Sequence, residues 1–242
     1  MSNLLEEYRR QRRIGLEGNI YHKTQVELAY NSNHIEGSQL TEEQTRQIFE
    51  TNTVDGHARL ADIQDTTNHF RLFDQMLEVA EEPLMPELLL AFHETLKRGT
   101  QQAESDPIFR PGVFKTLPNE VGGMMTAAPE DVPVRIQELA DAYERSPRAF
   151  EDIVDFHWRF ERIHPFQDGN GRVGRMVMFK ECLRNGVLPF IVADGKKQFY
   201  YRGLANYEGE PGWLLDTCRS FQDDFTARFL ALVPHVKVED RC

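Results

Sequence analysis

A short segment of this 242-residue sequence gathers the residue types that handle protons, metal ions and phosphate. Its sequence is His164-Pro165-Phe166-Gln167-Asp168-Gly169-Asn170-Gly171-Arg172-Val173-Gly174-Arg175. His164 is suited to removing a proton from an attacking hydroxyl near neutral pH. Asp168 offers a hard carboxylate oxygen to a Mg²⁺ ion that phosphate oxygens would also hold. Arg172 and Arg175 would share one helix face and could clamp two phosphate groups.

Two helical patterns, residues 150–163 and 173–185, flank this segment and must position it. Pro165 ends the first helix near the histidine, because the residue before a proline is pushed out of the α region. Gly169 and Gly171 allow left-handed or crowded backbone, so successive N–H groups can converge on an anion. We expect the second helix to start at the first arginine, with its dipole favouring negative charge. The pattern predicts a phosphate cradle.

The spacing His-Pro-Phe-x-Asp-Gly-Asn-Gly-Arg-x-x-Arg resembles the signature of Fic-domain proteins at all nine specified positions. The resemblance implies a mainly α fold, a Fic-type helical bundle with one β-hairpin flap. It also implies AMPylation, the transfer of AMP from ATP to a Ser, Thr or Tyr hydroxyl of a protein with loss of pyrophosphate. The resemblance gives a role to eight of the nine positions: the general base at His164, the loop anchor at Phe166, the Mg²⁺ ligand at Asp168, the anion hole at Gly169, Asn170 and Gly171, and the clamps on the outer phosphates at Arg172 and Arg175.

Two other interpretations of the segment stay open. In the first, the glycines form a plain helix–helix turn and the charged residues are packed or solvated. In the second, His157, His164 and Asp168 hold the metal of a hydrolase, although two histidines and an aspartate recur over so short a span by chance. We favour the phosphate cradle because turn chemistry does not explain His, Asp and two Arg at these spacings. His157 is then a core histidine or one that supports the site.

Helical spacing lapses between residues 98 and 130, where prolines and glycines bracket two extended stretches, 113–117 and 121–126. They predict a hairpin flap over residues 113–126. An exposed strand edge there could dock a target protein through main-chain hydrogen bonds, and similar flaps precede the motif in Fic proteins. The alternative is a structural hairpin that only covers the core.

Aromatic residues after the motif suggest where a nucleobase could bind. Tyr200, Tyr201, Leu204 and Tyr207 fall on one amphipathic helix, and the corresponding region of Fic proteins helps to enclose adenine and ribose. A buried core stripe is the more frequent explanation for aromatic residues at helical spacing. Tyr200 and Tyr201 are therefore candidates for an adenine pocket, with the core stripe as the alternative.

A second motif lies near the N-terminus. Ser32 and Glu36 are four residues apart at the end of a predicted helix that Gly37 terminates, so both lie on one face. The pattern resembles the Ser/Thr-x-x-x-Glu-Gly/Asn inhibitory motif of Fic proteins whose brake is N-terminal. The resemblance implies that Glu36 pairs with Arg175 and blocks productive placement of the γ-phosphate. We therefore expect the resting protein to be only weakly active.

Most of the remaining sequence has helical periodicity, which indicates a mainly α protein. We expect residues 1–57 to form a helical regulatory segment with the inhibitory motif, and residues 58–242 to form the Fic catalytic domain. Thr41 begins a capping box. Further helices are predicted at residues 5–16, 21–35, 58–79, 87–97, 132–143, 196–207 and 213–232.

The composition limits the kinds of partner and the environment that we expect for this protein. The formal net charge of −11 argues against broad nucleic-acid binding, and the arginines at positions 9, 10, 12 and 13 are interpreted as a solvated helix face. No secretory signal or membrane-spanning run is evident, so we expect a cytoplasmic protein without membrane contact. Cys182, Cys218 and Cys242 suggest reduced thiols, neither a disulfide framework nor a zinc site. A homo-oligomer is left open.

These patterns lead to one preferred function and two rivals. The preferred function is AMP transfer from ATP, with Mg²⁺, to a hydroxyl of a target protein docked on the flap. The first rival is hydrolytic removal of AMP from a modified protein, in which Glu36 positions a water molecule. The second is a non-catalytic module that senses nucleotide or binds a partner.

Overall fold

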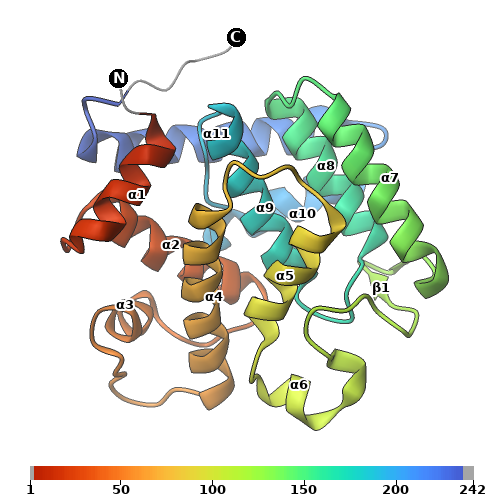
Figure 1. The fold of residues 1–242 in the computed structure, drawn as a ribbon, viewed down its shortest axis with the longest axis horizontal. Coiled ribbons are helices and arrows are strands. Elements are labelled where there is room, and N and C mark those ends of the chain that lie inside the picture. The colour runs from red at the N-terminus through yellow and green to blue at the C-terminus, as the bar shows by residue number, and fades with distance from the viewer. Residues whose placement is uncertain (1–2, 237–242) are drawn as a thin grey trace.

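The computed structural model describes residues 3–236, which form a bundle of helices with one short hairpin (Figure 1). The α-helices are α1 (Leu4–Ile14), α2 (Ile20–Ile35), α3 (Glu42–Thr51), α4 (Leu60–Glu78), α5 (Pro86–Lys97), α6 (Gln101–Ser105), α7 (Val132–Arg145), α8 (Phe150–Ile163), α9 (Asn170–Asn185), α10 (Lys197–Asn206) and α11 (Pro211–Phe229). Strands β1 (Glu120–Val121) and β2 (Met124–Met125) pair antiparallel. The mainly α fold with a hairpin is as predicted.

Helix α9 forms the centre of the bundle. Almost all of its residues are buried, so it has no solvated face, as expected for a helix enclosed by others. It contacts α1, α2, α4, α5 and α8. Because α9 begins directly after the glycine-rich segment, the bundle holds that segment's end of the helix in a fixed position.

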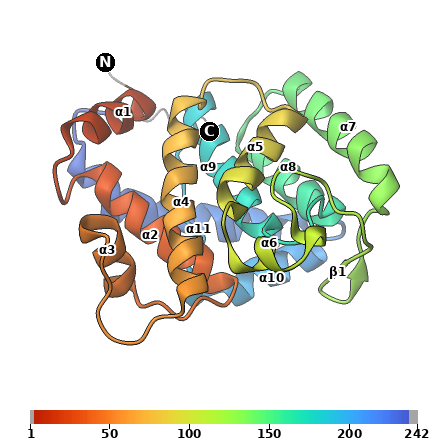
Figure 2. The same ribbon diagram turned by 60° about the horizontal axis from the view of Figure 1, so that its bottom comes forward.

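The N-terminal helices α1–α3 pack on the same core as the rest of the chain. Figure 2 shows α4 between these helices and the side of the molecule that carries α5 and α7. Tyr8 of α1 is fully buried and its ring packs edge-on against Phe73 of α4 and Phe179 of α9. The division into a regulatory segment, residues 1–57, and a catalytic domain stays a prediction.

The sequence suggests that the arginine-rich face of α1 is solvated. In the structure, two of these arginines instead contact the rest of the bundle. The Arg9 guanidinium bonds to the Leu77 carbonyl at 2.9 Å and to Glu81, and Arg12 pairs with Asp74 at 3.1 Å. These contacts join α1 to the C-terminal part of α4. The charges therefore help to attach the N-terminal segment to the bundle.

The flap is shorter than predicted and lies further along the chain. Residues 113–117 are not a strand, because their backbone groups bond to the glycine-rich segment and not to a neighbouring strand. The Lys115 N–H donates to the Pro165 carbonyl at 2.8 Å, and the Leu117 N–H donates to the Gln167 side chain at 3.3 Å. The pairing within the hairpin consists of β1 and β2 and one flanking bond, in which the Thr126 N–H donates to the Asn119 carbonyl at 3.3 Å. The short helix α6 in the preceding stretch was not predicted.

Most helix limits agree with the sequence patterns. Thr41 caps α3 with the reciprocal bonds of a capping box. Leu60, the first residue of α4, is 83% exposed although it is apolar. Cys182 and Cys218 are buried free thiols, and Cys242 lies outside the described residues. Between residues 3 and 236, no helix is long and apolar enough to cross a membrane.

Candidate active site

His164 stands at the end of α8 in a left-handed backbone conformation, with φ 51°. Pro165 cannot continue the helix, and the His164 N–H closes it by donating to the Phe160 carbonyl at 2.8 Å. The imidazole Nδ1 lies 3.3 Å from the Glu161 carbonyl oxygen. The ring lines a cavity, so Nε2 is the nitrogen that we assign to a substrate.

The loop after His164 is braced from inside. Asn170 accepts the Phe166 N–H at 2.8 Å and donates to the Phe166 carbonyl at 2.9 Å. The Phe166 ring is fully buried and stacks on the His93 ring with centroids 4.0 Å apart. Burial lowers the pKa of His93 to about 3, so this imidazole is neutral. His93 therefore accepts the Gly112 N–H at Nδ1, 3.0 Å away, and faces the Asp168 carbonyl with Nε2.

Helix α9 begins two residues earlier than predicted, at Asn170 instead of Arg172. Gly169 makes the turn with φ 84°, so the helix can start immediately after it. Gly171 is thus helical and is not the left-handed residue that the sequence allowed. A Cβ there would collide with the Glu36 carboxylate and lie 2.8 Å from an Arg175 nitrogen. The missing side chain lets a carboxylate approach the N-terminal turn of α9, a favourable place for an anion.

Arg175 is buried, and its side chain forms hydrogen bonds to residues at the C-terminal end of α2. Its Nη2 donates to Glu36 Oε1 at 2.7 Å and to the Ser32 carbonyl at 2.9 Å, and its Nε donates to Ser32 Oγ at 3.0 Å. Burial opposes the charge of Arg175, but the Glu36 carboxylate outweighs it and raises the pKa of the guanidinium. The pairing that the resemblance implies is therefore present in the structure, whereas its inhibitory role is a proposal.

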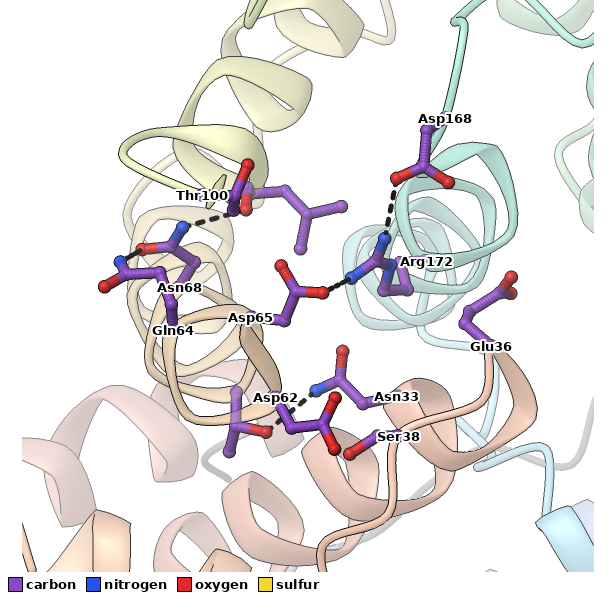
Figure 3. Close-up of polar contacts among 12 residues, drawn as sticks. Asn33, Glu36, Ser38, Asp62, Gln64, Asp65, Asn68, Thr100, Asp168 and Arg172 are labelled. Carbon is purple, nitrogen blue, oxygen red and sulfur yellow. Dashed lines mark hydrogen bonds and ion pairs between the residues drawn. The ribbon is translucent and has the colours of Figure 1, made fainter. Parts of the chain in front are cut away.

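Asp168 and Arg172 belong to a chain of charges that sequence reasoning found only in part (Figure 3). Asp168 Oδ2 contacts the Lys97 ammonium at 2.5 Å and the Arg172 guanidinium at 3.1 Å. Arg172 also donates to Asp65 Oδ2 at 2.8 Å. Burial opposes ionisation of Asp168, but Arg172 and Lys97 outweigh it, so the pKa of this carboxyl lies below its usual range.

Lys97 and Asp65 were missed, although each has a signal in the sequence. Lys97 continues the buried positions Leu89 and His93 at intervals of four residues, so its side chain points into the bundle. Asp65 similarly precedes the buried residues Asn68 and Leu72 of α4 at helical spacing. A charged residue on a buried helical stripe needs a partner of opposite charge, which indicates a polar site.

We predict that Asp65→Asn destabilises the protein. Arg172 is 4% exposed and would keep only Asp168 as a charged partner, so the loss is that of one charged hydrogen bond. We expect the free energy of unfolding to fall by about 1–3 kcal/mol. Urea denaturation measures this loss. Glu81→Gln, which removes the exposed partner of Arg9, is the control and should change stability by less than about 1 kcal/mol; an equal effect of both variants would contradict the prediction.

A cavity of about 550 Å³ lies beside the motif, within the usual size range of small-ligand sites, and Asp168 and Arg172 are not among its lining residues. His164, Arg175, Gly171 and Glu36 line one part of it. The remaining lining residues are Val121, Gly122, Met124, Trp158, Glu161, Arg162, Tyr200, Tyr201, Leu204 and Ala205. The hairpin thus borders the same cavity as the histidine.

The two candidate tyrosines differ in their surroundings. Tyr200 is buried and its hydroxyl lies 2.5 Å from His157 Nε2, whereas Tyr201 is 46% exposed. Trp158 donates from its indole N–H to the Leu204 carbonyl at 3.0 Å and stacks on Tyr207, which is not among the lining residues. Trp158, Tyr200, Tyr201 and Leu204 thus give the cavity an aromatic and apolar part of its lining, which suits a flat base.

The geometry does not support the interpretation in which His157, His164 and Asp168 hold the metal of a hydrolase. Within residues 3–236, no group of three or more His, Cys, Asp or Glu side chains is placed to hold a metal ion. His157 is 1% exposed and contacts Tyr200, which agrees with a core histidine. Asp168 alone would bind a metal only together with oxygen ligands from elsewhere, such as phosphates.

Fold and site together define a helical protein with a nucleotide-sized cavity whose wall includes a helix N-terminal turn, a histidine and a buried arginine. Residues 83–182 match the Fic/DOC family, so this chain carries a Fic domain, as the sequence resemblance indicated. The protein adenylyltransferase Fic of Drosophila willistoni is 30% identical over 181 residues, 72% of this chain and 35% of that protein. The chain therefore spans about a third of the length of the curated relatives it matches.

Solved structures share the fold. A Fic-domain-containing signaling protein from Bacteroides thetaiotaomicron has a TM-score of 0.72 at 23% identity, over 98% of this chain and 99% of that chain. A Fic family protein from Desulfovibrio desulfuricans has a TM-score of 0.71 at 25% identity, over 98% of this chain and 74% of that chain. The helices that position the candidate site are thus arranged as in other Fic proteins.

Proposed function

We propose that this chain is a protein adenylyltransferase that transfers AMP from ATP to a Ser, Thr or Tyr hydroxyl of a target protein. The observation that carries the proposal is the single cavity that brings together His164, the N-terminal turn of α9 and Arg175. The curated relatives, named protein adenylyltransferases, support the same reaction.

The reaction assigns one task to each group. His164 accepts the proton of the target hydroxyl at Nε2, and the hydroxyl oxygen attacks the α-phosphorus of ATP. A bond forms from this oxygen to phosphorus as the bond to pyrophosphate breaks, and pyrophosphate leaves with its electron pair. The first turn of α9 and the two motif arginines, Arg172 and Arg175, stabilise the phosphate charge.

Asp168 fits the role of a Mg²⁺ ligand. Its carboxyl is ionised at neutral pH, and both of its cationic contacts, from Lys97 and Arg172, are made to Oδ2. We assign the other carboxylate oxygen to the metal. Mg²⁺ would neutralise charge on the phosphates and on the leaving pyrophosphate. Lys97 and Arg172 hold the carboxylate in place for the metal.

The hairpin is our candidate docking surface for the target. Its strands are exposed, with Met125 67% exposed, and Val121, Gly122 and Met124 border the cavity that holds His164. A target segment added along the β1–β2 hairpin, the paired part of the predicted flap 113–126, would bring its hydroxyl to the mouth of this cavity. The binding mode uses main-chain bonds, so it sets few requirements on the target's sequence.

We also propose that Glu36 inhibits the transfer. Its carboxylate lies against Gly171 and pairs with Arg175, so an ATP phosphate and Glu36 compete for the same guanidinium. The same carboxylate faces the cavity, which also suits the rival activity, hydrolysis of an AMP-modified protein through a water bound to Glu36.

Mass spectrometry tests the proposed function directly. Glu36→Gly protein is incubated with ATP, Mg²⁺ and cell extract, and we expect proteins that gain the mass of AMP on a hydroxyl residue. A gain of another mass would replace AMP with another group. Loss of AMP from a pre-modified protein, abolished by Glu36→Ala, would favour the hydrolase. ATP binding without any modification by wild type or Glu36→Gly would favour the non-catalytic module.

A further inference from the structure

Three buried polar side chains, Glu161, His157 and Tyr200, form a row that leads from His164 into α8 and α10. None of the three has a role in the proposed reaction. Glu161 Oε2 lies 3.6 Å from His164 Nδ1, one turn back along α8. One turn further back, His157 is 1% exposed, and its Nε2 contacts the Tyr200 hydroxyl at 2.5 Å. The row therefore leads from the cavity into the core.

Glu161 is placed as a buried anion. The residue is 9% exposed, and Oε1 has no hydrogen-bond partner among the described residues. Burial opposes its ionisation, but the contact with His164 and the charge of Arg175 outweigh it and lower the pKa of this carboxyl. An ionised carboxylate that is buried beside the ring of His164 stabilises positive charge there.

Gly174 makes room for this carboxylate. A Cβ at position 174 would lie 2.9 Å from Glu161 Oε1 and 2.9 Å from His157 Nδ1. Any larger residue would therefore push Glu161 or His157 away. The close packing of α8 on α9 thus holds the carboxylate next to His164, in a position that the glycine alone permits.

We propose that Glu161 is a positioning residue for His164. His164 Nδ1 lies 3.3 Å from the carbonyl oxygen and 3.6 Å from the carboxylate oxygen Oε2 of Glu161, so we assign the ring proton to Nδ1, which leaves Nε2 free to accept a proton. When Nε2 takes the proton of the target hydroxyl, the imidazole becomes positive and the Glu161 carboxylate stabilises it. The inference rests on the proposed function, in which His164 is the base.

Other charged and titratable groups around the pair shape its pH response. Glu161 is faced by His157 on its own helix, Arg175 on α9 and Tyr200 on α10. The further titratable groups that line the cavity are Glu36, Arg162 and Tyr201. Glu161 is the carboxylate that contacts the His164 ring, so its removal should lower the pKa of His164.

Glu161→Gln in the Glu36→Gly background tests the proposal. The amide keeps the shape of the side chain and removes its charge. We expect kcat for AMP transfer to fall about 10- to 100-fold, less than loss of a triad carboxylate, because the Glu161 carbonyl still orients the ring. KM for ATP should change less than about threefold. The acidic limb of the pH–rate profile should move to lower pH by about one unit, because His164 stays unprotonated in more acidic solution.

A measurement that does not depend on AMP transfer can test the role of Glu161 separately from the proposed function. NMR titration of His164, assigned by its absence from the spectrum of His164→Asn, should show a lower pKa in Glu161→Gln. Glu151→Gln, about 20 Å away at the other end of α8, is the control and should leave both readouts unchanged. If no variant transfers AMP, the proposed function fails while the titration still decides whether Glu161 acts on His164.

Two outcomes would overturn the proposal. One is an unchanged His164 titration in Glu161→Gln. The other is a lower kcat with a pH profile parallel to that of the parent, which would mean that Glu161 is only structural. If Glu161→Gln does not fold, Glu161→Asp takes its place. It moves the carboxylate one methylene away from His164, so the His164 pKa and kcat should fall in the same direction as in Glu161→Gln but by less, and an unchanged titration would reject the charge-based role.

Discussion

Glu36→Gly is expected to modify itself with AMP roughly 10- to 50-fold faster than the wild-type chain. The charged hydrogen bond from Arg175 to Glu36, 2.7 Å long, is worth about 1.5–3 kcal/mol, and each 1.4 kcal/mol changes an equilibrium tenfold. We take the lower part of this range because the Glu36 side chain is 34% exposed and solvent screens its charge. Incorporation of labelled AMP from ATP, with time and at fixed Mg²⁺, measures the rate.

The structure offers two comparisons for this variant. Glu36→Gln keeps the length of the side chain without its charge, so it should release part of the inhibition if the charge pair is responsible. Glu17→Gly changes an exposed glutamate between α1 and α2 and should leave the rate unchanged. Equal rates for wild type and Glu36→Gly would contradict the inhibitory role of Glu36.

The same contact links inhibition to stability. Without Glu36, the buried Arg175 keeps its hydrogen bonds to Ser32 but loses the carboxylate that pairs with it directly, and a guanidinium is costly to bury without a direct partner of opposite charge. An ATP phosphate would then supply the missing charge. ATP should therefore raise the melting temperature of Glu36→Gly more than that of the wild-type chain, because binding to the folded state stabilises it.

Local spacing was enough to predict the part of the site that lies on one helix end. His164, Asp168, Arg172 and Arg175 are close in sequence, and a turn into a helix N-terminus fixes where they point. The contact between Glu36 and Arg175 was predicted from a second motif, through its resemblance to the inhibitory motif of Fic proteins. Both motifs depend on residue types at short intervals, which a single sequence contains.

Contacts between distant segments could not be predicted in the same way. Residues 113–117 have the extended composition of a strand, but Lys115 bonds to Pro165, and no local pattern identifies that partner. Lys115 also places its buried ammonium within 3.2 Å of the Ile163 carbonyl, next to the histidine. Asp65 likewise meets Arg172 across the bundle. Only the packing of the helices determines these partners.

His164→Asn in the Glu36→Gly background is expected to lower the rate of AMP transfer by about 10²–10⁴-fold, the usual contribution of a general base. Asparagine is preferred to alanine because residue 164 has φ 51°, and asparagine tolerates this left-handed backbone better than other non-glycine residues. The variant should therefore fold as the parent does. Single-turnover transfer of labelled AMP to the chain itself gives the rate.

The affinity for ATP distinguishes a lost base from a damaged site. The proposed phosphate contacts come from α9, and the loop that leads into it is held by Asn170 and Phe166, none of which the substitution removes. We therefore expect the Kd for ATP, measured by calorimetry, to stay within about threefold of the parent's. Weaker ATP binding in proportion to the lost rate would place His164 in nucleotide binding. An unchanged rate would transfer the role of base to another group, and the carboxylate nearest the vacated position is Glu161.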